Sequence, residues 1–284
     1  MRYLITGSSG QLARELIGKL ETRSAEYAAP DESRCDIADP AAVGQAVASF
    51  RPTVIVNCAA YNLVDRAEQD RDTAFRVNAT GPRVLAEAAR KAGARLVHFS
   101  TDYVFDGTKE TGLYTETDPV NPLNEYGRSK LAGERAVQDV LGSDALVLRL
   151  SWVFGPGQQN FIRKFLERVA AGEPLQATYD EFSVPTWTGT VADVTLRAAA
   201  QGMTGLYHLT NSGYCSRYEW AKLILRARGE ERFVLPVPLE RFGLPARRPR
   251  FTAMSNAAIA NALSLRIPPW EETVAAFVQQ GGAA

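Results

Sequence analysis

The sequence predicts an α/β protein with a doubly wound parallel sheet and a smaller second domain, also of α/β type. Two features of the chain support this fold class. Short apolar runs of strand length alternate with longer helix-like segments through the first 150 residues. The strand-like runs are almost continuously apolar, which is typical of parallel strands that helices cover on both faces.

The predicted elements follow one another in a regular order. Four apolar runs bounded by turn residues predict strands at residues 2–6, 53–59, 95–100 and 145–151. Helix-like segments occupy residues 11–20, 40–50, 73–92 and 125–140. A further strand is expected to end near Asp31, although the stretch SAEYAAPD has little β character.

The domain boundaries follow a change in the character of the chain. After Ser151, glycine, proline and aromatic residues cluster and the regular alternation lapses. We therefore predict that residues 1–150 form the domain that holds the main sheet, with a return to it at residues 186–209. A helix at 191–200 and a strand at 205–210 mark this return. The second domain is expected to comprise residues 151–185 and 210–284.

Composition limits the kind of partner. Lys plus Arg and Asp plus Glu both total 32, so no global basic field attracts nucleic acid or a membrane surface, and a small-molecule partner is expected. The first residues leave no room for a secretory leader, and no apolar run approaches the ~18 residues of a membrane span. We therefore expect a cytoplasmic protein. Three separated cysteines and two histidines in strand-like runs predict neither a disulfide scaffold nor a zinc site.

The turn after the first strand has the residues of a dinucleotide-binding loop. In TGSSGQLA, Gly7 and Gly10 are three residues apart, and Ala13 occupies a third small position. Glycine lets the backbone turn tightly and approach a pyrophosphate, which the N–H groups at a helix N-terminus can bind. Because this loop joins the first strand to the first helix, it predicts a Rossmann-type dinucleotide-binding domain.

Asp31 is a candidate ligand of the adenosine ribose. It follows Gly10 by 21 residues, near the expected end of the second strand, where a carboxylate can accept hydrogen bonds from ribose hydroxyls. Its negative charge would disfavour a ribose phosphate and so favour NADH over NADPH. A solvated loop aspartate is an equal alternative, because the preceding strand is poorly formed in the sequence.

Two other strands end in residues suited to ligands. One ends in NCAAY (57–61), whose small residues let the backbone pass beneath a cofactor, although strand packing explains them equally well. Another is followed by Ser100, Thr101 and Asp102 at the carboxyl edge, where open α/β sheets bind ligands. A hydroxyl there can hold a carbonyl oxygen, and a Ser/Thr turn is the alternative. Asn78, in VNATG, is interpreted as a buried hydrogen-bonding side chain.

Two pairs of Tyr and Lys have the spacing of a catalytic pair. Tyr126 and Lys130, in NEYGRSKLAGE, are four residues apart on a predicted helix, so phenol and ammonium can reach one reacting atom. Tyr218 and Lys222, in RYEWAK, repeat this spacing. Only the first pair follows Thr101 on the helix before the next strand, where all three residues can converge. The second helix has the pattern of a packed amphipathic element, so we choose the first pair.

In this order, the motifs TGSSGQLA, NCAAY, VNATG, STDYVFDG and YGRSK resemble the extended short-chain dehydrogenase/reductase superfamily. Within it, STDYVFDG with NEYGRSKLAGE, LSWVFG and VPTWT is most similar to the dTDP-4-dehydrorhamnose reductase family, over essentially the whole chain. The resemblance implies a Rossmann domain followed by a sugar-nucleotide domain. It also implies the reduction of the C4 keto group of dTDP-4-dehydro-L-rhamnose to give dTDP-L-rhamnose, with NADPH or NADH as cofactor.

The resemblance assigns roles to individual residues. The catalytic residues correspond to Thr101, Tyr126 and Lys130. The substrate contacts are Thr101, Asp102, Tyr126 and Trp152. The cofactor contacts carry over to Gly10, Gln11, Leu12, Asp31, Asp36, Ile37, Ala59, Ala60, Tyr61, Tyr126 and Lys130. Lys130 is expected to stabilise the tyrosinate, because a nearby cation lowers the pKa of a phenol. The chain departs from the family pattern at Ala13, where glycine is usual, and at MSN (254–256), where the pattern more often ends in Asp.

Some members of the family bind magnesium through glutamates at a dimer interface. Glu15 matches one such position, but TWTGTVAD lacks a glutamate where another is expected. We therefore predict no metal site, and a homodimer is left open. Two rival functions also stay open. One is another sugar-nucleotide epimerase, dehydratase or reductase of the superfamily, and the other is a non-catalytic subunit similar to the regulatory β-subunit of methionine adenosyltransferase.

The densest basic patch of the C-terminal region lies in ARRPRF. It consists of Arg247, Arg248 and Arg250. Arginine binds phosphate oxygens bidentately, so these side chains are candidates to bind the diphosphate of a sugar nucleotide. A solvated basic loop is the alternative.

Overall fold

The larger lobe is built on a parallel sheet of six strands in the order β10-β5-β4-β3-β1-β2. The computed structural model describes residues 1–157 and 160–281, so residues 158–159 and 282–284 of the expected second domain lie outside the described residues. The strands of this sheet are β1 (Arg2–Thr6), β2 (Glu26–Ala28), β3 (Val54–Asn57), β4 (Arg95–Thr101), β5 (Leu146–Leu150) and β10 (Gly205–His208). The parallel sheet predicted from the sequence is confirmed.

The strand order creates a switch point between β1 and β3. The chain passes from β1 to its neighbour β2 and then returns to the other side of β1 to form β3. The connections that follow β1 and β3 therefore leave the sheet toward opposite sides. Such a point opens a crevice at the carboxyl ends of the strands, where doubly wound sheets bind their ligands.

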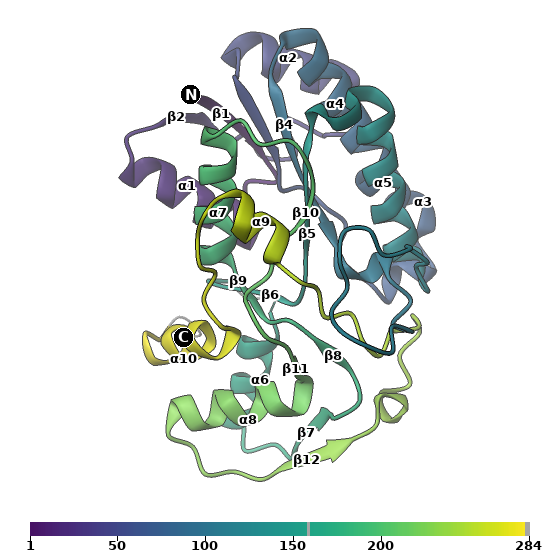
Figure 1. Cartoon of the computed structure of the whole chain (residues 1–284), viewed down its shortest axis with the longest axis vertical. Helices are drawn as coiled ribbons and strands as arrows, with labels where there is room; N and C mark the ends of the chain where they lie inside the picture. Colours follow the sequence, from purple (N-terminus) through teal and green to yellow (C-terminus); the bar gives the residue numbers. More distant parts are fainter. Residues whose placement is uncertain (158–159, 282–284) are drawn as a thin grey trace.

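Helices cover both faces of the sheet (Figure 1). On one face lie α1 (Gln11–Thr22), α7 (Thr188–Ala200) and α9 (Ala257–Ala262). On the other lie α2 (Pro40–Phe50), α4 (Gly81–Ala92) and α5 (Glu125–Leu141). The single helix predicted for residues 73–92 is divided into α3 (Arg71–Phe75), a π-helical turn (Arg76–Thr80) and α4. Helix-length patterns do not reveal such a turn, because its apolar spacing is close to that of an α-helix.

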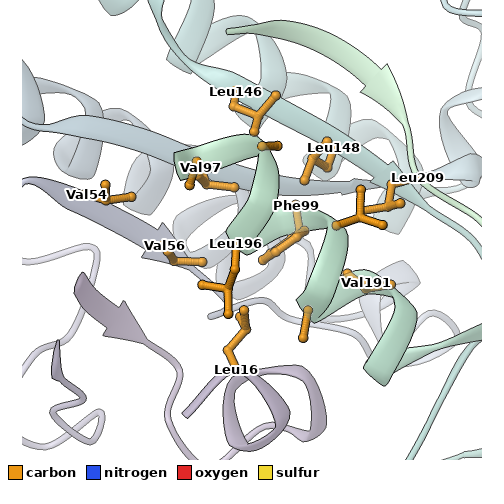
Figure 2. Packing of buried hydrophobic residues seen from close by; sticks show 14 of the residues in the cluster. Leu16, Val54, Val56, Val97, Phe99, Leu146, Leu148, Val191, Leu196 and Leu209 are labelled. Atoms are coloured by element: carbon orange, nitrogen blue, oxygen red, sulfur yellow. The ribbon is translucent and has the colours of Figure 1, made fainter. Parts of the chain in front are cut away.

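The first of these faces is packed by aliphatic side chains from helices and strands (Figure 2). Leu16 of α1 and Leu196 of α7 share one buried cluster with Val56 and Phe99 of the sheet. Burial of a side chain of this size contributes ~1.5–3 kcal/mol. Ile55, which alternates with Val56 along β3, packs on the opposite face. The crevice at the strand ends therefore lies on a base that is packed from both sides.

The smaller lobe, in the lower half of Figure 1, is assembled from two-stranded pieces that distant segments contribute. The pairs are β6 (Val153–Phe154) with β9 (Thr186–Trp187), β7 (Leu175–Thr178) with β12 (Val234–Val237), and β8 (Phe182–Ser183) with β11 (Cys215–Ser216). Helices α6 (Phe161–Ala170), α8 (Arg217–Arg228) and α10 (Trp270–Gln279) complete this lobe. Trp220 of α8 is 1% exposed in its core and contacts the ring of Phe154.

The chain crosses between the lobes more than once. After β9, α7 covers the main sheet and β10 pairs with β5 as its edge strand. Ile259 of α9 and Leu263 are then buried again in the core of the larger lobe, before α10 packs in the smaller one. The sequence did not predict this second return, since a helix of six residues carries too short an apolar pattern. Among the described residues, no helix is long and apolar enough to cross a membrane.

Candidate active site

The loop after β1 passes directly against the end of β3. Gly7 has a φ of 67°, and a Cβ atom on it would lie 2.6 Å from the backbone nitrogen of Ala59. A residue with a side chain therefore cannot replace it without moving the loop. Gly10 donates its N–H to the Gly7 carbonyl at 2.9 Å and precedes α1 without any side-chain cap. The helix thus presents its first N–H groups toward the crevice, which suits a pyrophosphate.

A cavity of about 370 Å³ occupies the crevice. Six segments of the chain line it: the N-terminus of α1, the residues after β3, the end of β4, the start of α5, the turn after β5 and the first residue of α8. The predicted site residues that line this cavity are Gly10, Gln11, Leu12, Ala59, Ala60, Thr101, Asp102, Tyr126, Lys130 and Trp152. Residues chosen for a cofactor and residues chosen for a substrate therefore share one cavity.

Tyr126 lies at the start of α5, which polar side chains fix in place. The N-cap residue Asn124 accepts a hydrogen bond from Gly127 N at 2.8 Å and donates one to the carbonyl of Arg247, also at 2.8 Å. The Tyr126 hydroxyl donates to Asn62 Oδ1 at 3.4 Å, and its ring meets Tyr103 edge-on at 5.9 Å. The phenol is thus held at the cavity wall.

Lys130 lies one turn further along α5 and is only 3% exposed. Its Nζ donates to the carbonyl oxygen of Phe99 in β4 at 2.6 Å. Burial lowers the pKa of Lys130 to about 8, and the charge of Glu134 opposes this shift. The ammonium therefore keeps most of its charge at neutral pH.

The pKa of Tyr126 shifts in the opposite direction from the one expected. Loss of solvation raises the pKa of this phenol to about 12, although a hydrogen bond with Thr101 opposes the shift. The expected lowering by Lys130 does not appear, and desolvation of the phenol outweighs the hydrogen bond with Thr101. Tyr126 is therefore fully protonated at neutral pH, as a proton donor needs to be.

The π-helical turn between α3 and α4 supports this pair. Asn78 in that turn is 1% exposed and accepts a hydrogen bond from Tyr61 N at 2.9 Å. Its Nδ2 donates to the carbonyl of Tyr61 at 3.0 Å and to Ser129 Oγ at 2.9 Å. Ser129 in turn donates to the carbonyl of Tyr126 at 2.7 Å. The interpretation of Asn78 as a buried hydrogen-bonding residue is confirmed, and this side chain links the loop after β3 to α5.

Asp102 is buried among hydroxyl groups. Its carboxylate is 3% exposed and accepts hydrogen bonds from Thr101 at 3.1 Å, Ser151 at 3.2 Å, Ser183 at 2.9 Å and Thr252 at 2.5 Å. Burial raises the pKa of Asp102, and the four hydroxyls oppose that shift. Ser183 and Thr252 belong to the smaller lobe, so this carboxylate joins the two lobes directly behind Thr101.

Two polar groups at the cavity have no protein partner among the described residues. The Ser100 hydroxyl and the Trp152 indole N–H are both buried and unpaired. Trp152 has a φ of 37°, which is strained for a bulky residue. Its ring stacks on Trp220 at 5.6 Å, and Arg217 Cζ lies 3.6 Å from the ring centre. Unpaired buried groups and backbone strain of this kind are typical of functional sites.

Arg217 was not predicted from the sequence. Its only local signal is its place directly after Ser216, which forms a capping box with Glu219 at the start of α8. A capping box predicts a helix start but no ligand. The role of Arg217 depends on Trp152, which lies 65 residues earlier in the chain, and no local pattern reveals such a contact.

Asp31 does not line the cavity and lies in an exposed loop after β2. Its carboxylate accepts hydrogen bonds from Ser33 Oγ at 2.7 Å and Arg34 N at 3.0 Å, and these bonds hold its pKa below the usual value. The loop still lies beside the glycine turn, because Ser8 donates to the carbonyl of Pro30 at 3.2 Å. Asp31 is therefore near the dinucleotide crevice, but its carboxylate is engaged within its own loop.

Four other predicted cofactor residues also lie outside the cavity lining, namely Gly7, Asp36, Ile37 and Tyr61. Asp36 forms an ion pair with Arg76 at 2.7 Å, and this hydrogen bond lowers its pKa. Ile37 is 4% exposed and packs against Gly81 of α4. Tyr61 donates its hydroxyl to Asp70 at 3.1 Å.

The basic patch predicted in the C-terminal region is mostly neutralised. Arg248 forms a two-pronged pair with Asp65, at 2.5 and 2.7 Å. Arg250 pairs with Asp180 and Glu240. Among the described residues, no group of three or more His, Cys, Asp or Glu side chains is placed to hold a metal ion.

The two histidines are packed residues, as expected. His98 is 1% exposed, and its Nδ1 meets Asn57 Nδ2 at 3.1 Å. Burial holds the pKa of His98 well below its usual value, so the ring is neutral. His208 is fully buried, and its ring packs edge-on against Phe105 at 5.6 Å.

Comparison with known proteins matches both lobes. The family model described as RmlD substrate binding domain matches residues 1–282. A dTDP-4-dehydrorhamnose reductase of Burkholderia thailandensis is 37% identical, over 98% of this chain and 98% of its own. A dTDP-4-keto-6-deoxy-D-glucose reductase of Streptomyces niveus is 37% identical, over 95% of this chain and 93% of its own.

Solved structures show the same relationship. The dTDP-4-dehydrorhamnose reductase of Bacillus anthracis, solved in complex with NADP, has a TM-score of 0.94 and 34% identity over 98% of this chain and 99% of its own. The resemblance seen in the sequence is confirmed at the level of the family. Since these matches extend across both lobes, the chain belongs to the RmlD substrate binding domain family, together with dTDP-4-dehydrorhamnose reductases.

Proposed function

We propose that the protein is an NAD(P)H-dependent oxidoreductase that reduces the C4 keto group of dTDP-4-dehydro-L-rhamnose to give dTDP-L-rhamnose. One observation carries the proposal. Thr101, Tyr126 and Lys130 line the same cavity as Gly10 at the N-terminus of α1. A proton donor, a cation and a dinucleotide loop are thus within one space. Family membership and the names of the relatives support the same substrate class.

The residues of the crevice fit a nicotinamide dinucleotide. Gly7 and Gly10 let the backbone approach a pyrophosphate, and the N-terminus of α1 offers N–H groups to it. Gln11, Leu12, Ala59 and Ala60 would line the remainder of the dinucleotide's path. When bound, NADPH or NADH supplies the hydride that reduces the sugar carbon. Asp31, Asp36, Ile37 and Tyr61 are proposed for the adenosine side, outside the cavity.

Tyr126 is proposed as the proton donor. Because its pKa is raised to about 12, the phenol carries its proton throughout the neutral range. It can therefore protonate the alkoxide that develops on the substrate oxygen. Thr101 lies beside it and is proposed to orient the carbonyl group, since a hydroxyl can donate to that oxygen.

Lys130 is proposed to stabilise the tyrosinate that proton transfer leaves behind and to hold the nicotinamide ribose. Its ammonium has three donors, and Phe99 O accepts one of them at 2.6 Å. Two donors are left for other partners. Burial of the cation strengthens its interaction with a developing negative charge.

The sugar is proposed to lie between Tyr126 and Trp152. The Trp152 ring forms part of the cavity wall, and its indole N–H is unpaired. Asp102 was predicted to contact the substrate, and it also lines the cavity. Because four hydroxyls occupy its carboxylate, we propose that it acts chiefly by holding Thr101 and the smaller lobe in place.

A direct assay tests the proposal. The purified protein should consume NADPH or NADH when supplied with dTDP-4-dehydro-L-rhamnose, and NMR of the product should identify dTDP-L-rhamnose. A panel of dTDP- and UDP-linked 4-keto sugars separates this function from another reductase or epimerase of the superfamily. Lack of turnover with every member of the panel would favour the non-catalytic subunit. The homodimer stays a prediction, which sedimentation of the purified protein tests.

A further inference from the structure

A buried ion pair lies one helical turn beyond Lys130. Glu134 of α5 and Arg149 of β5 are 7% and 4% exposed, and neither side chain lines the cavity at the strand ends. The guanidinium donates to both carboxylate oxygens, from Nε at 2.9 Å and from Nη2 at 2.7 Å. A two-pronged pair of this kind fixes the orientation of the carboxylate as well as its distance.

Lys130 and the ion pair join two turns of one helix to two neighbouring strands. Lys130 and Glu134 are four residues apart and both buried, so they share the face of α5 that meets the sheet. Lys130 reaches the carbonyl of Phe99 in β4, while Glu134 reaches Arg149 in β5. Phe99 is paired in register with Leu148, the residue before Arg149. The ammonium and the ion pair therefore lie side by side against the sheet.

Two of the three buried charges are positive and one is negative. Arginine stays charged in proteins, so the Arg149 guanidinium needs the Glu134 carboxylate. Burial lowers the pKa of Lys130 to about 8, and the charge of Glu134 limits this fall. Stability alone does not explain the pair, because apolar residues of similar volume often replace a buried ion pair without loss.

We propose that Glu134 is a positioning residue for Lys130: Arg149 fixes its carboxylate, and the fixed negative charge keeps the buried ammonium charged and directed at the end of β4. This inference rests on the proposed function, in which Lys130 acts as a cation, and it names the group that maintains the charge. Glu134 acts through Lys130, since it does not line the cavity itself. A buried charge acts strongly on its neighbour because little water screens it.

The other groups around Lys130 and its cavity do not supply this charge. Several are neutral near pH 7, because burial raises the pKa of a phenol or thiol and lowers that of an imidazole: Cys58, His98, Tyr103 and Tyr126. Ionisation of Asp102, whose pKa burial raises, adds negative charge as the pH rises and so cannot cause loss of the ammonium. The π-helical turn contributes Asn78, which does not titrate. The ion pairs of α3 and α4 with α5 lie at other positions of the helix: Arg71 with Glu125, and Arg83 with Asp139.

NMR of protein labelled with ¹³C at the lysine Cε carbons follows the protonation of Lys130 directly. Its signal is identified by its loss in Lys130→Met, and the wild-type midpoint should lie near pH 8. Glu134→Gln/Arg149→Met removes both charges of the pair and leaves no unpaired ion, so the fold should be retained. The midpoint should then fall by about one pH unit, because the attracting carboxylate is lost.

Two further variants separate the charge of Glu134 from its packing. Glu134→Gln alone leaves the Arg149 guanidinium without a counter-charge, so it should lower the midpoint further than the double variant. Glu134→Asp keeps the charge on a shorter side chain, so its midpoint should be closer to pH 8 than to pH 7, even where its melting temperature falls. The matched control is Arg83→Met/Asp139→Asn, which removes an exposed ion pair between α4 and α5 and should leave the midpoint unchanged.

Kinetics show whether the charge affects turnover. Between pH 6 and pH 8.5, kcat/KM of the double variant relative to wild type should fall roughly 5–10-fold, because more of its Lys130 has lost the proton. If the pair only fixed α5 on β5, the Glu134 variants would lower the melting temperature, while the midpoint and the pH dependence would stay as in wild type. That result would overturn the inference.

The NMR midpoint needs no substrate, so it distinguishes failure of the inference from failure of the proposed function. If the midpoint falls in the double variant while no 4-keto sugar is reduced, the role of Glu134 stands and the proposed function is wrong. If wild-type protein reduces the sugar and the midpoint is the same in every Glu134 variant, the proposed function stands and the inference falls.

Discussion

The two Tyr and Lys pairs have the same spacing on a helix but differ in burial, in their contacts and in their position relative to the cavity. Lys130 is 3% exposed and donates to the end of β4, whereas Lys222 is exposed and lies 5.5 Å from the centre of the Tyr218 ring. Tyr126 lines the catalytic cavity, whereas Tyr218 packs against the core of the smaller lobe. Spacing alone does not distinguish the pairs.

This comparison shows that the position of a pair relative to the sheet, and not its spacing, determines whether the pair lines the cavity. Helix α5 begins near the carboxyl end of β4, so Tyr126 and Lys130 in its first turns line the crevice. Helix α8 is anchored by a capping box and packs on α10 and β7. Arg217 at its start lines the cavity, but Tyr218 and Lys222 do not. Burial then changes the chemistry, since it lowers the pKa of Lys130 to about 8.

Replacement of Tyr126 should give the largest fall in kcat. Tyr126→Phe keeps the ring and its contact with Tyr103 but removes the acidic proton. We expect kcat to fall by roughly 10²–10⁴-fold, which is typical for the loss of a general acid. Steady-state kinetics measure this, while the melting temperature and the Kd for NADPH should stay close to wild type. Retention of kcat would show that another group donates the proton.

Lys130→Met should give the second-largest loss of activity, and it should change two quantities, kcat and the Kd for NADPH. Loss of the ammonium removes the support of the tyrosinate and the proposed contact with the ribose. We expect kcat to fall by about 10-fold or more and the Kd for NADPH to rise, because charge-assisted hydrogen bonds contribute ~1.5–3 kcal/mol each. A fall in kcat with unchanged cofactor affinity would contradict the second role.

The pH dependence of kcat/KM in the wild-type enzyme tests whether the charge of Lys130 is needed, without a mutation. Burial favours the neutral amine, so the ammonium loses its proton near pH 8 rather than above pH 10. We expect kcat/KM to decline above about pH 8, while Tyr126, with a pKa of about 12, stays protonated. This limb should disappear in Lys130→Met. A profile that is flat up to pH 10 would show that the charge of Lys130 is not needed in the free enzyme.

One half of the candidate site, around Thr101 and Tyr126, could be located from the sequence because its signals are local. Gly7 turns the chain where a side chain would collide with Ala59, and such positions select glycine. The strands are apolar on both faces, so their ends, and with them Thr101, can be located by counting residues. Tyr126 follows from the order of the elements. Each of these inferences uses a pattern only a few residues long.

The other half could not be predicted because it depends on contacts between distant segments. Asp102 meets Thr252 across 150 residues of sequence, and Trp152 meets Arg217 across 65. Six strands of the smaller lobe are two to four residues long, which is too short for an alternating pattern. The pKa of Tyr126 was expected to fall, since the sequence names its charged neighbour but not the loss of water around it.

Asp31 was also chosen by its spacing, in this case from Gly10, and its replacement should have a small effect on cofactor preference. Asp31→Ala removes a negative charge near the proposed ribose site, so the ratio of kcat/KM for NADPH to that for NADH should increase. The increase should be only a few-fold, because the carboxylate is exposed and its bonds to Ser33 and Arg34 hold it within its loop. Kinetics with both cofactors measure the ratio. An unchanged ratio would remove Asp31 from the cofactor site and leave the fold assignment intact.

The smallest change in kcat is expected for variants of Tyr218 and Lys222. Tyr218→Phe keeps the ring that packs in the smaller lobe and removes only its hydroxyl group. Lys222→Met removes an exposed cation whose contact with the Tyr218 ring contributes ~0.5–1 kcal/mol at most. Because neither side chain lines the catalytic cavity, both variants should keep kcat within a few-fold of wild type, measured in the same assay as Tyr126→Phe. Their melting temperatures should fall by no more than a few degrees. If Tyr218→Phe abolished turnover while Tyr126→Phe preserved it, the catalytic pair would lie on α8, and the argument that position at the strand ends creates the site would be wrong.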